Sequence, residues 1–182
     1  MPTIEGYAAL FNSLSENLGG FRERITAGAF KRALGAKDLD VRALINHDAN
    51  LVLGRSKAGT LTLAEDERGL KVSIRPPNTT YARDLVESLE RGDIDQMSFA
   101  FIVAEDGDRV TREAEGIVRD VDDIEELLDT SVVTYPAYTD TSVQVSVRSI
   151  ERAKALAEPA PAPTPVPEGK SKAEAWERAT AA

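Results

Sequence analysis

Short segments in which apolar and polar residues alternate recur through most of the first 150 residues, and they constrain the fold more than any other feature. Apolar residues fill every second position at Val41, Ala43 and Ile45, and the same spacing returns at 70–74 and 143–147. Successive side chains of a strand point to opposite faces, so this period predicts strands with one buried face. Further strands are expected over residues 4–11, 51–56, 60–64, 97–104, 109–112, 117–121 and 128–135.

Two helices are expected to interrupt these strands. The first begins at the capping residue Thr26, and the second begins at Asn78 or Thr79 and ends at Gly92. A third helix is expected over 148–157, and the acidic segment 105–108 is expected to form a hairpin turn in which Gly supplies the positive φ. Many strands, few helices and no β-α-β order predict a mainly β protein with peripheral helices (α+β), built as a mainly antiparallel barrel or sandwich.

The domain organisation follows from a proline-rich segment near the C-terminus. Proline occupies every second position from 159 to 167, which removes backbone donors and favours extended polyproline geometry. We therefore expect a folded domain over 1–157 and a Pro/Ala-rich linker over 158–170. Residues 171–182 are expected to form a short helix or tail around Trp176, because Ser171 and Glu174 make a capping box.

Composition excludes several functional classes. The net charge of −9 argues against a nucleic-acid partner, which needs a clustered basic surface. Cysteine is absent and histidine occurs once, so a disulfide framework, a cysteine nucleophile and a metal site are not expected. No stretch approaches the roughly 20 apolar residues of a membrane span. The acidic start of the chain is unlike a signal peptide, so we expect residence in a reducing cytoplasm.

The single histidine and one strand serine are the candidate catalytic residues. His47 follows an expected strand, and Ser98 is the one hydroxyl on an otherwise apolar row that continues with Ala100 and Ile102. A serine needs a base to become a nucleophile, so the two side chains are the smallest set for acyl transfer. From spacing alone two structural roles stay open: a turn histidine bonded to Asp48, and a buried serine bonded to backbone.

A third residue would orient the imidazole and stabilise its protonated form. Asp129 leads into an apolar strand, where an unpaired carboxylate is costly, and it is the preferred candidate. Asp48 is the alternative, but it neighbours His47 in sequence, and adjacent strand residues point to opposite faces. Asp129 could also be a solvated carboxylate at the end of the acidic run 120–126.

Five ordered blocks of the chain resemble a known family. Residues 6–12, 23–30, 46–55, 92–101 and 129–138 are similar to successive blocks of the caudoviral prohead maturation serine proteases. The resemblance implies a barrel similar to that of the herpesvirus assemblin proteases, with His47 as general base and Ser98 as nucleophile. The family usually has glutamate where this chain has Asp129, so the third role is the one that this difference puts in question.

The resemblance also implies a function. It indicates a serine endopeptidase of procapsid maturation that needs no cofactor, with the major capsid protein, its scaffold segment and the protease itself as substrates. Self-association inside the procapsid, in the host cytoplasm, is expected. The alternative is a non-catalytic capsid assembly or scaffolding protein that keeps the same barrel for interactions. A hydrolase of small esters is a more distant alternative, because no Gly-x-Ser-x-Gly elbow surrounds Ser98.

Overall fold

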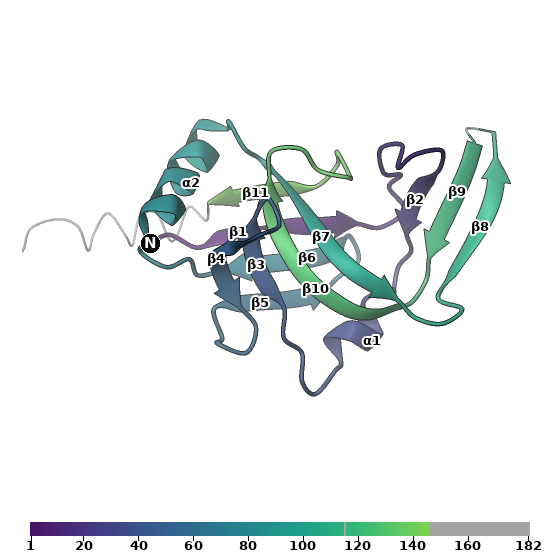
Figure 1. The fold of residues 1–182 in the computed structure, drawn as a ribbon, viewed down its shortest axis with the longest axis horizontal. Helices are drawn as coiled ribbons and strands as arrows, with labels where there is room; N and C mark the ends of the chain where they lie inside the picture. The colour runs from purple at the N-terminus through teal and green to yellow at the C-terminus, as the bar shows by residue number, and fades with distance from the viewer. Residues whose placement is uncertain (115, 146–182) are drawn as a thin grey trace, which may run out of the picture.

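The computed structural model describes residues 1–114 and 116–145, and within them the chain forms eleven strands and two short helices (Figure 1). The strands are β1 (Ile4–Leu10), β2 (Arg22–Ile25), β3 (Arg42–Ile45), β4 (Asp48–Arg55), β5 (Leu61–Glu65), β6 (Gly69–Ile74), β7 (Gln96–Val103), β8 (Asp108–Glu113), β9 (Gly116–Val121), β10 (Ile124–Val133) and β11 (Ser142–Val145). The helices are α1 (Lys31–Leu34) and α2 (Thr80–Arg91). The mainly β class with few helices is therefore confirmed.

The strands form three sheets. One has the order β11-β1-β6-β5, the second β4-β3-β10-β7, and the third β2-β9-β8. Most pairs are antiparallel, as expected, but β3 runs parallel to β10 and β2 runs parallel to β9. The mainly antiparallel pairing agrees with the prediction, and these two parallel pairs are features that the sequence did not indicate. Long connections between the paired strands allow parallel pairing, and local alternation cannot reveal it.

The core lies between the two four-stranded sheets. Ile4 of β1, Ile74 of β6 and Met97 of β7 are fully buried there with Phe30. The ring of Phe30 meets the ring of Phe99 edge to face, with centroids 5.6 Å apart. No helix in the described ranges is long and apolar enough to cross a membrane.

The helix α2 forms as its sequence predicts. Thr79 precedes it in an extended conformation, and Gly92 ends it in the left-handed region with φ of 76°. One side of the helix is buried, and Leu85 and Leu89 lie on that side. The hydroxyl of Tyr81 donates a 2.8 Å hydrogen bond to the carbonyl oxygen of Val52, which places the helix beside the outer edge of β4.

Two local expectations are wrong. The first helix does not begin at Thr26: the chain makes turns there and only Lys31–Leu34 are helical. Segment 105–108 is not a hairpin, because β7 pairs with β10 and β8 pairs with β9. The positive φ falls on Asp106 at 57°, while Gly107 is needed for space, since a Cβ there would lie 2.5 Å from the carbonyl oxygen of Asp123.

A buried polar contact joins the third sheet to the loop that follows β10. Glu23 of β2 accepts a 2.7 Å hydrogen bond from the hydroxyl of Tyr138 and a 3.1 Å bond from Arg119 of β9. Burial raises the pKa of Tyr138, and the nearby Glu23 carboxylate raises it further. The ring of Tyr138 stacks on Phe99, whose neighbour in β7 is Ser98, so this contact supports the strand that carries the serine.

The expected third helix over 148–157, the linker over 158–170 and the segment 171–182 lie outside the described residues, so the domain boundaries stay predictions. Closure of the sheets into a barrel stays a prediction as well.

Candidate active site

The centre of the candidate site is the strand β10, which lies between β3 and β7. Ser131 of β10 lies directly opposite Ser98 of β7, and Asp129 lies opposite Ala100. Directly opposed residues in a sheet share a face. Met97 and Phe99, the neighbours of Ser98 in β7, point into the core. Ser98, Ser131 and Asp129 therefore share the outer face of this sheet.

His47 lies in a tight turn between β3 and β4. Ile45 pairs with Asp48, so the loop consists of Asn46 and His47, whose φ angles are 50° and 57°. Positive φ at both loop residues is what a type I′ hairpin turn requires. The turn is fastened to β10, because the backbone N–H of Asn46 donates a 2.9 Å bond to the carbonyl oxygen of Val132. The Asn46 side chain in turn accepts a 2.9 Å bond from the N–H of Thr134.

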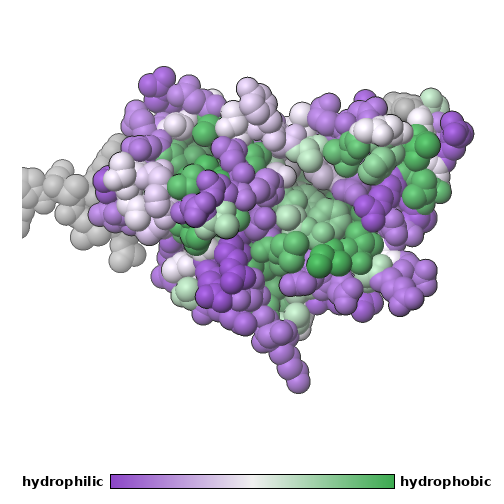
Figure 2. Space-filling view, viewed as in Figure 1, coloured by the Kyte–Doolittle hydropathy of each residue, from purple (hydrophilic) through white to green (hydrophobic). Residues whose placement is uncertain are grey.

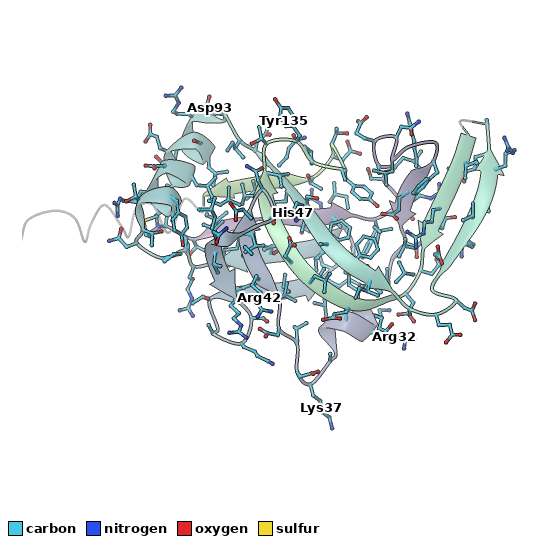
Figure 3. All side chains as sticks on the ribbon, in the orientation of Figure 1. Arg32, Lys37, Arg42, His47, Asp93 and Tyr135 are labelled. Carbon is cyan, nitrogen blue, oxygen red and sulfur yellow. The ribbon has the colours of Figure 1, made fainter. Side chains whose placement is uncertain are left out.

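The imidazole of His47 meets the carboxylate of Asp129. Nδ1 of His47 lies 2.8 Å from Oδ1 of Asp129, and the two side chains are 39% and 14% exposed. A carboxylate can only accept here, so Nδ1 carries the hydrogen, and Nε2 of the neutral ring keeps its lone pair. This is the tautomer that a general base needs when its Nε2 is to take a proton from a serine. Figure 3 shows His47 over the sheet, where the ribbons of β3 and β10 come together.

Asp48, the alternative partner of the imidazole, is engaged elsewhere. Its Oδ1 accepts two 2.8 Å hydrogen bonds from Asn50, one from the backbone N–H and one from the side-chain amide. The local structural role proposed for the histidine, a hydrogen bond to its neighbour Asp48, is therefore not what this structure contains.

Two serines face each other in the site, and their hydroxyls differ. The hydroxyl of Ser131 is fully buried and donates a 2.8 Å hydrogen bond to Oδ1 of Asp129. Ser98 is 7% exposed, and its hydroxyl makes no hydrogen bond to any described residue. The backbone-bonded serine that the sequence left open is thus absent from the described part of the chain. Unlike the Ser131 hydroxyl, the Ser98 hydroxyl has no hydrogen-bond partner in the part of the chain that the structure describes, which is compatible with the nucleophile role expected for it.

Ser131 also links the two candidate catalytic groups in space. Its Oγ lies 3.3 Å from Nδ1 of His47. Directly opposed residues on neighbouring antiparallel strands have Cβ atoms about 4.5–5.5 Å apart. Because Ser131 lies next to both residues, the imidazole and the Ser98 hydroxyl lie on one small patch of the sheet.

A serine peptidase also has to stabilise the negative oxygen that forms when the scissile carbonyl is attacked. Arg55 and Arg75, at the ends of β4 and β6, carry positive charge but are bonded to other partners. Arg55 binds Asp40 through two hydrogen bonds of 2.6 Å and holds the pKa of that carboxyl at about 2. A guanidinium nitrogen of Arg75 donates to the carbonyl oxygen of Gly59.

Sequence reasoning missed Ser131 and Asn46. Asp129 and Ser131 are two positions apart in a strand and thus on one face, which is a signal that the sequence contains. The role of Asn46 depends on the turn and on the path of β10 beyond it, and neither is visible in local periodicity.

Comparison with known proteins decides the family. Residues 1–155 match the family profile described as the caudovirus prohead serine protease. The chain belongs to this family. It is 30% identical over 157 residues to the prohead protease of Enterobacteria phage HK97, an alignment that covers 85% of this chain and 64% of that protein. The chain therefore spans somewhat less than two thirds of the length of this curated relative.

Among solved structures, the varicella-zoster virus protease is similar over 85% of this chain and 74% of that one, with a TM-score of 0.42 and 16% sequence identity. The family resemblance first inferred from five sequence blocks is confirmed by the family match.

Proposed function

We propose that this member of the prohead protease family is a serine endopeptidase of phage procapsid maturation, with Ser98 as nucleophile, His47 as general base and Asp129 as the orienting acid. The observation that carries the proposal is the 2.8 Å contact between Nδ1 of His47 and Oδ1 of Asp129, on the face that also holds Ser98, whose hydroxyl has no hydrogen-bond partner among the described residues.

Each proposed step uses an atom of this arrangement. Ser98 Oγ attacks the scissile carbonyl carbon while Nε2 of His47 takes the hydroxyl proton, and the positive imidazolium is stabilised by the Asp129 carboxylate. The imidazolium then gives the proton to the departing amine, which leaves an acyl group on Ser98. Water, deprotonated by the same Nε2, hydrolyses this ester and regenerates the serine. The sequence of steps needs no cofactor.

The surface beside Ser98 suits a peptide with apolar side chains. Ile102 of β7 and Leu128 of β10 are 45% and 41% exposed. Figure 2 shows hydrophobic side chains gathered over the region where Figure 1 places these two strands. A few exposed apolar residues are ordinary on any surface, but here they lie further along the strands that carry Ser98 and Asp129, which favours an extended substrate with apolar side chains.

We further propose that the substrates are the scaffold, or the scaffold-like part of the major capsid protein, and the protease itself. The protease would act inside the procapsid in the host cell, where copies of this chain would associate. An assemblin-like, mainly antiparallel barrel is the fold proposed for the domain. It is supported by the contact between the two four-stranded sheets, where the N–H of Val143 in β11 donates a 2.8 Å bond to the carbonyl oxygen of Asp95, just before β7.

Co-expression with the capsid subunit of the same phage tests this function. The wild-type chain should shorten the capsid subunit, and Ser98→Ala should leave both chains intact, as measured by their intact masses. Ser88→Ala is the matched control, because Ser88 lies on α2 and, among the described residues, its hydroxyl bonds only to the helix carbonyl of Asp84. Normal processing by Ser98→Ala would refute Ser98 as the nucleophile, whereas no processing by the wild-type chain would favour the non-catalytic alternative.

A further inference from the structure

We infer that Ser131 is a positioning residue of the site: its hydroxyl orients the Asp129 carboxylate and the His47 turn together, and thereby holds the imidazole in the tautomer that can accept a proton from Ser98. The inference deepens the proposed function and rests on it. Ser131 would touch neither the substrate nor the reacting atoms, and would act through its two neighbours.

Hydrogen bonds around Ser131 form a closed ring. Its hydroxyl donates to Oδ1 of Asp129 at 2.8 Å, and its oxygen accepts from the backbone N–H of His47 at 3.3 Å. The same Oδ1 lies 2.8 Å from Nδ1 of His47. The backbone and the ring of the histidine are therefore both tied to one carboxylate oxygen, and Ser131 supplies the second connection.

Proton positions in this ring are determined by elimination. The Asp129 carboxylate only accepts, so both Nδ1 of His47 and Oγ of Ser131 point their hydrogens at it. The 3.3 Å approach between Ser131 Oγ and His47 Nδ1 is then a contact between two donors that share an acceptor. If Ser131 lost its hydroxyl, Oδ1 would lose one of the two donors that the described residues give it, and the carboxylate could rotate away from Nδ1.

The surroundings explain why this support matters. His47 lies in a two-residue turn and its side chain is 39% exposed, so packing alone does not restrain the ring. Ser131 is fully buried, so water does not compete for its hydrogen bond. A hydrogen bond to a charged group contributes about 1.5–3 kcal/mol, which corresponds to roughly a 10- to 100-fold change in a rate or an equilibrium.

The neighbouring residue Thr130 provides a matched control. It lies on the same strand and is equally buried, but it pairs with Phe99 and Ala43 on the core side. Its hydroxyl is buried without a hydrogen-bond partner among the described residues. Thr130→Val therefore removes a buried hydroxyl one position away and leaves the hydrogen bonds among Ser131, Asp129 and His47 in place.

Two measurements on the full-length chain test the inference. His47 is the only histidine, so in protein prepared without a histidine tag the imidazole nitrogen signals in an NMR spectrum belong to it alone. The second measurement is the rate at which a fluorophosphonate probe, which reacts with activated serines, modifies Ser98. The spectrum does not depend on peptidase activity, so a failure of the proposed function and a failure of this inference can be told apart.

In the wild-type chain and in Thr130→Val, we expect hydrogen on Nδ1 and an unprotonated Nε2 at neutral pH. In Ser131→Ala, we expect a mixture of tautomers, a broadened or lost Nδ1–H signal, and a probe reaction about 10- to 100-fold slower. Ser131→Cys, which keeps the volume but is a weak donor, should behave like Ser131→Ala and serves if the alanine variant does not fold. An unchanged tautomer and probe rate in a folded Ser131 variant would overturn the inference, as would equal losses in Thr130→Val.

Discussion

The carboxylate of Asp129 offers the sharpest test of the proposed mechanism, through the substitution Asp129→Asn. Oδ1 of Asp129 is the atom that meets both Nδ1 of His47 and the hydroxyl of Ser131. An asparagine that keeps its oxygen in this place still accepts both hydrogens. The imidazole would then keep its tautomer, and the variant would lose mainly the negative charge.

The size of the effect follows from the distance between the charges. When His47 becomes an imidazolium during the reaction, it forms an ion pair with Asp129 across the 2.8 Å contact, with charge centres about 4 Å apart. At an effective dielectric constant of about 20 this attraction is about 4 kcal/mol, and solvent screening of the half-exposed imidazole reduces it. A loss of roughly 3 kcal/mol corresponds to a turnover rate about 100-fold lower. Substrate binding should change little, because the charge of the imidazole develops only during the reaction.

The assay compares three variants by capsid processing and by fluorophosphonate modification of Ser98. Asp48→Asn is the matched control, since Asp48 bonds to Asn50 and an asparagine oxygen can replace its Oδ1. It should cost much less than Asp129→Asn. Asp129→Glu, which restores the acid usual in the family, should keep substantial activity. The reasoning is refuted if Asp48→Asn is the more damaging change, or if Asp129→Asn slows turnover by only a few fold.

The remaining predictions concern pH and stability. Because the chain has one histidine, activity should fall on acidification through one ionisation. His47→Gln should remove both the activity and this pH dependence. If the variant stayed active and lost activity at low pH as the wild type does, another group would have to be the base. Hydrogen bonding to Arg24 lowers the pKa of Asp120 in the folded protein. The ionised carboxyl therefore stabilises the fold fully above the pKa of an unfolded aspartate, about 4. This stabilisation is lost as the pH falls through the lower pKa that Asp120 has in the folded protein. In Asp120→Asn, the free energy of unfolding measured with urea should therefore fall less steeply on acidification than in the wild type. An equally steep fall in both proteins below pH 4 would contradict this. Truncation after Ala157 should move the unfolding midpoint by at most a few degrees in thermal melts but should reduce the protease content of assembled procapsids; a large loss of stability would show that the segment around Trp176 packs on the domain.

Much of the sheet could be predicted because alternation reports which face of a strand is buried. The faces of β3 and β6 and the extent of α2 follow from local spacing and from Gly92. The short strand β2 was missed, because its sequence Arg-Glu-Arg-Ile has no apolar alternation. Glu23 is buried there only because Arg119 and Tyr138, about a hundred residues later in the sequence, meet its carboxylate.

The sequence could single out His47, Ser98 and Asp129 as candidates, but it could not show how the fold brings them together. Nothing local in the sequence indicates that β3 pairs in parallel with β10, yet this pairing brings the His47 turn to the end of the strand that carries Asp129. The turn itself lacks the Asn-Gly pair that usually signals a type I′ hairpin, because His47 takes the position where glycine is common. Ser131 lies opposite Ser98 because β10 pairs with β7 in one register, and the two residues are some thirty positions apart in the sequence. Local sequence patterns do not determine such a register.

A bulge in β10 explains how an acid within a buried strand comes to face the site. Leu127 is buried in the core, so strict alternation would turn Leu128 outward and Asp129 inward. The register between β10 and β7 shifts between Leu127 and Asp129, which places one extra residue in β10. Leu128 and Asp129 consequently both leave the core side, while Thr130 returns to it. The irregularity is therefore what allows one strand to pack Leu127 and Thr130 in the core and still present Asp129 and Ser131 to His47.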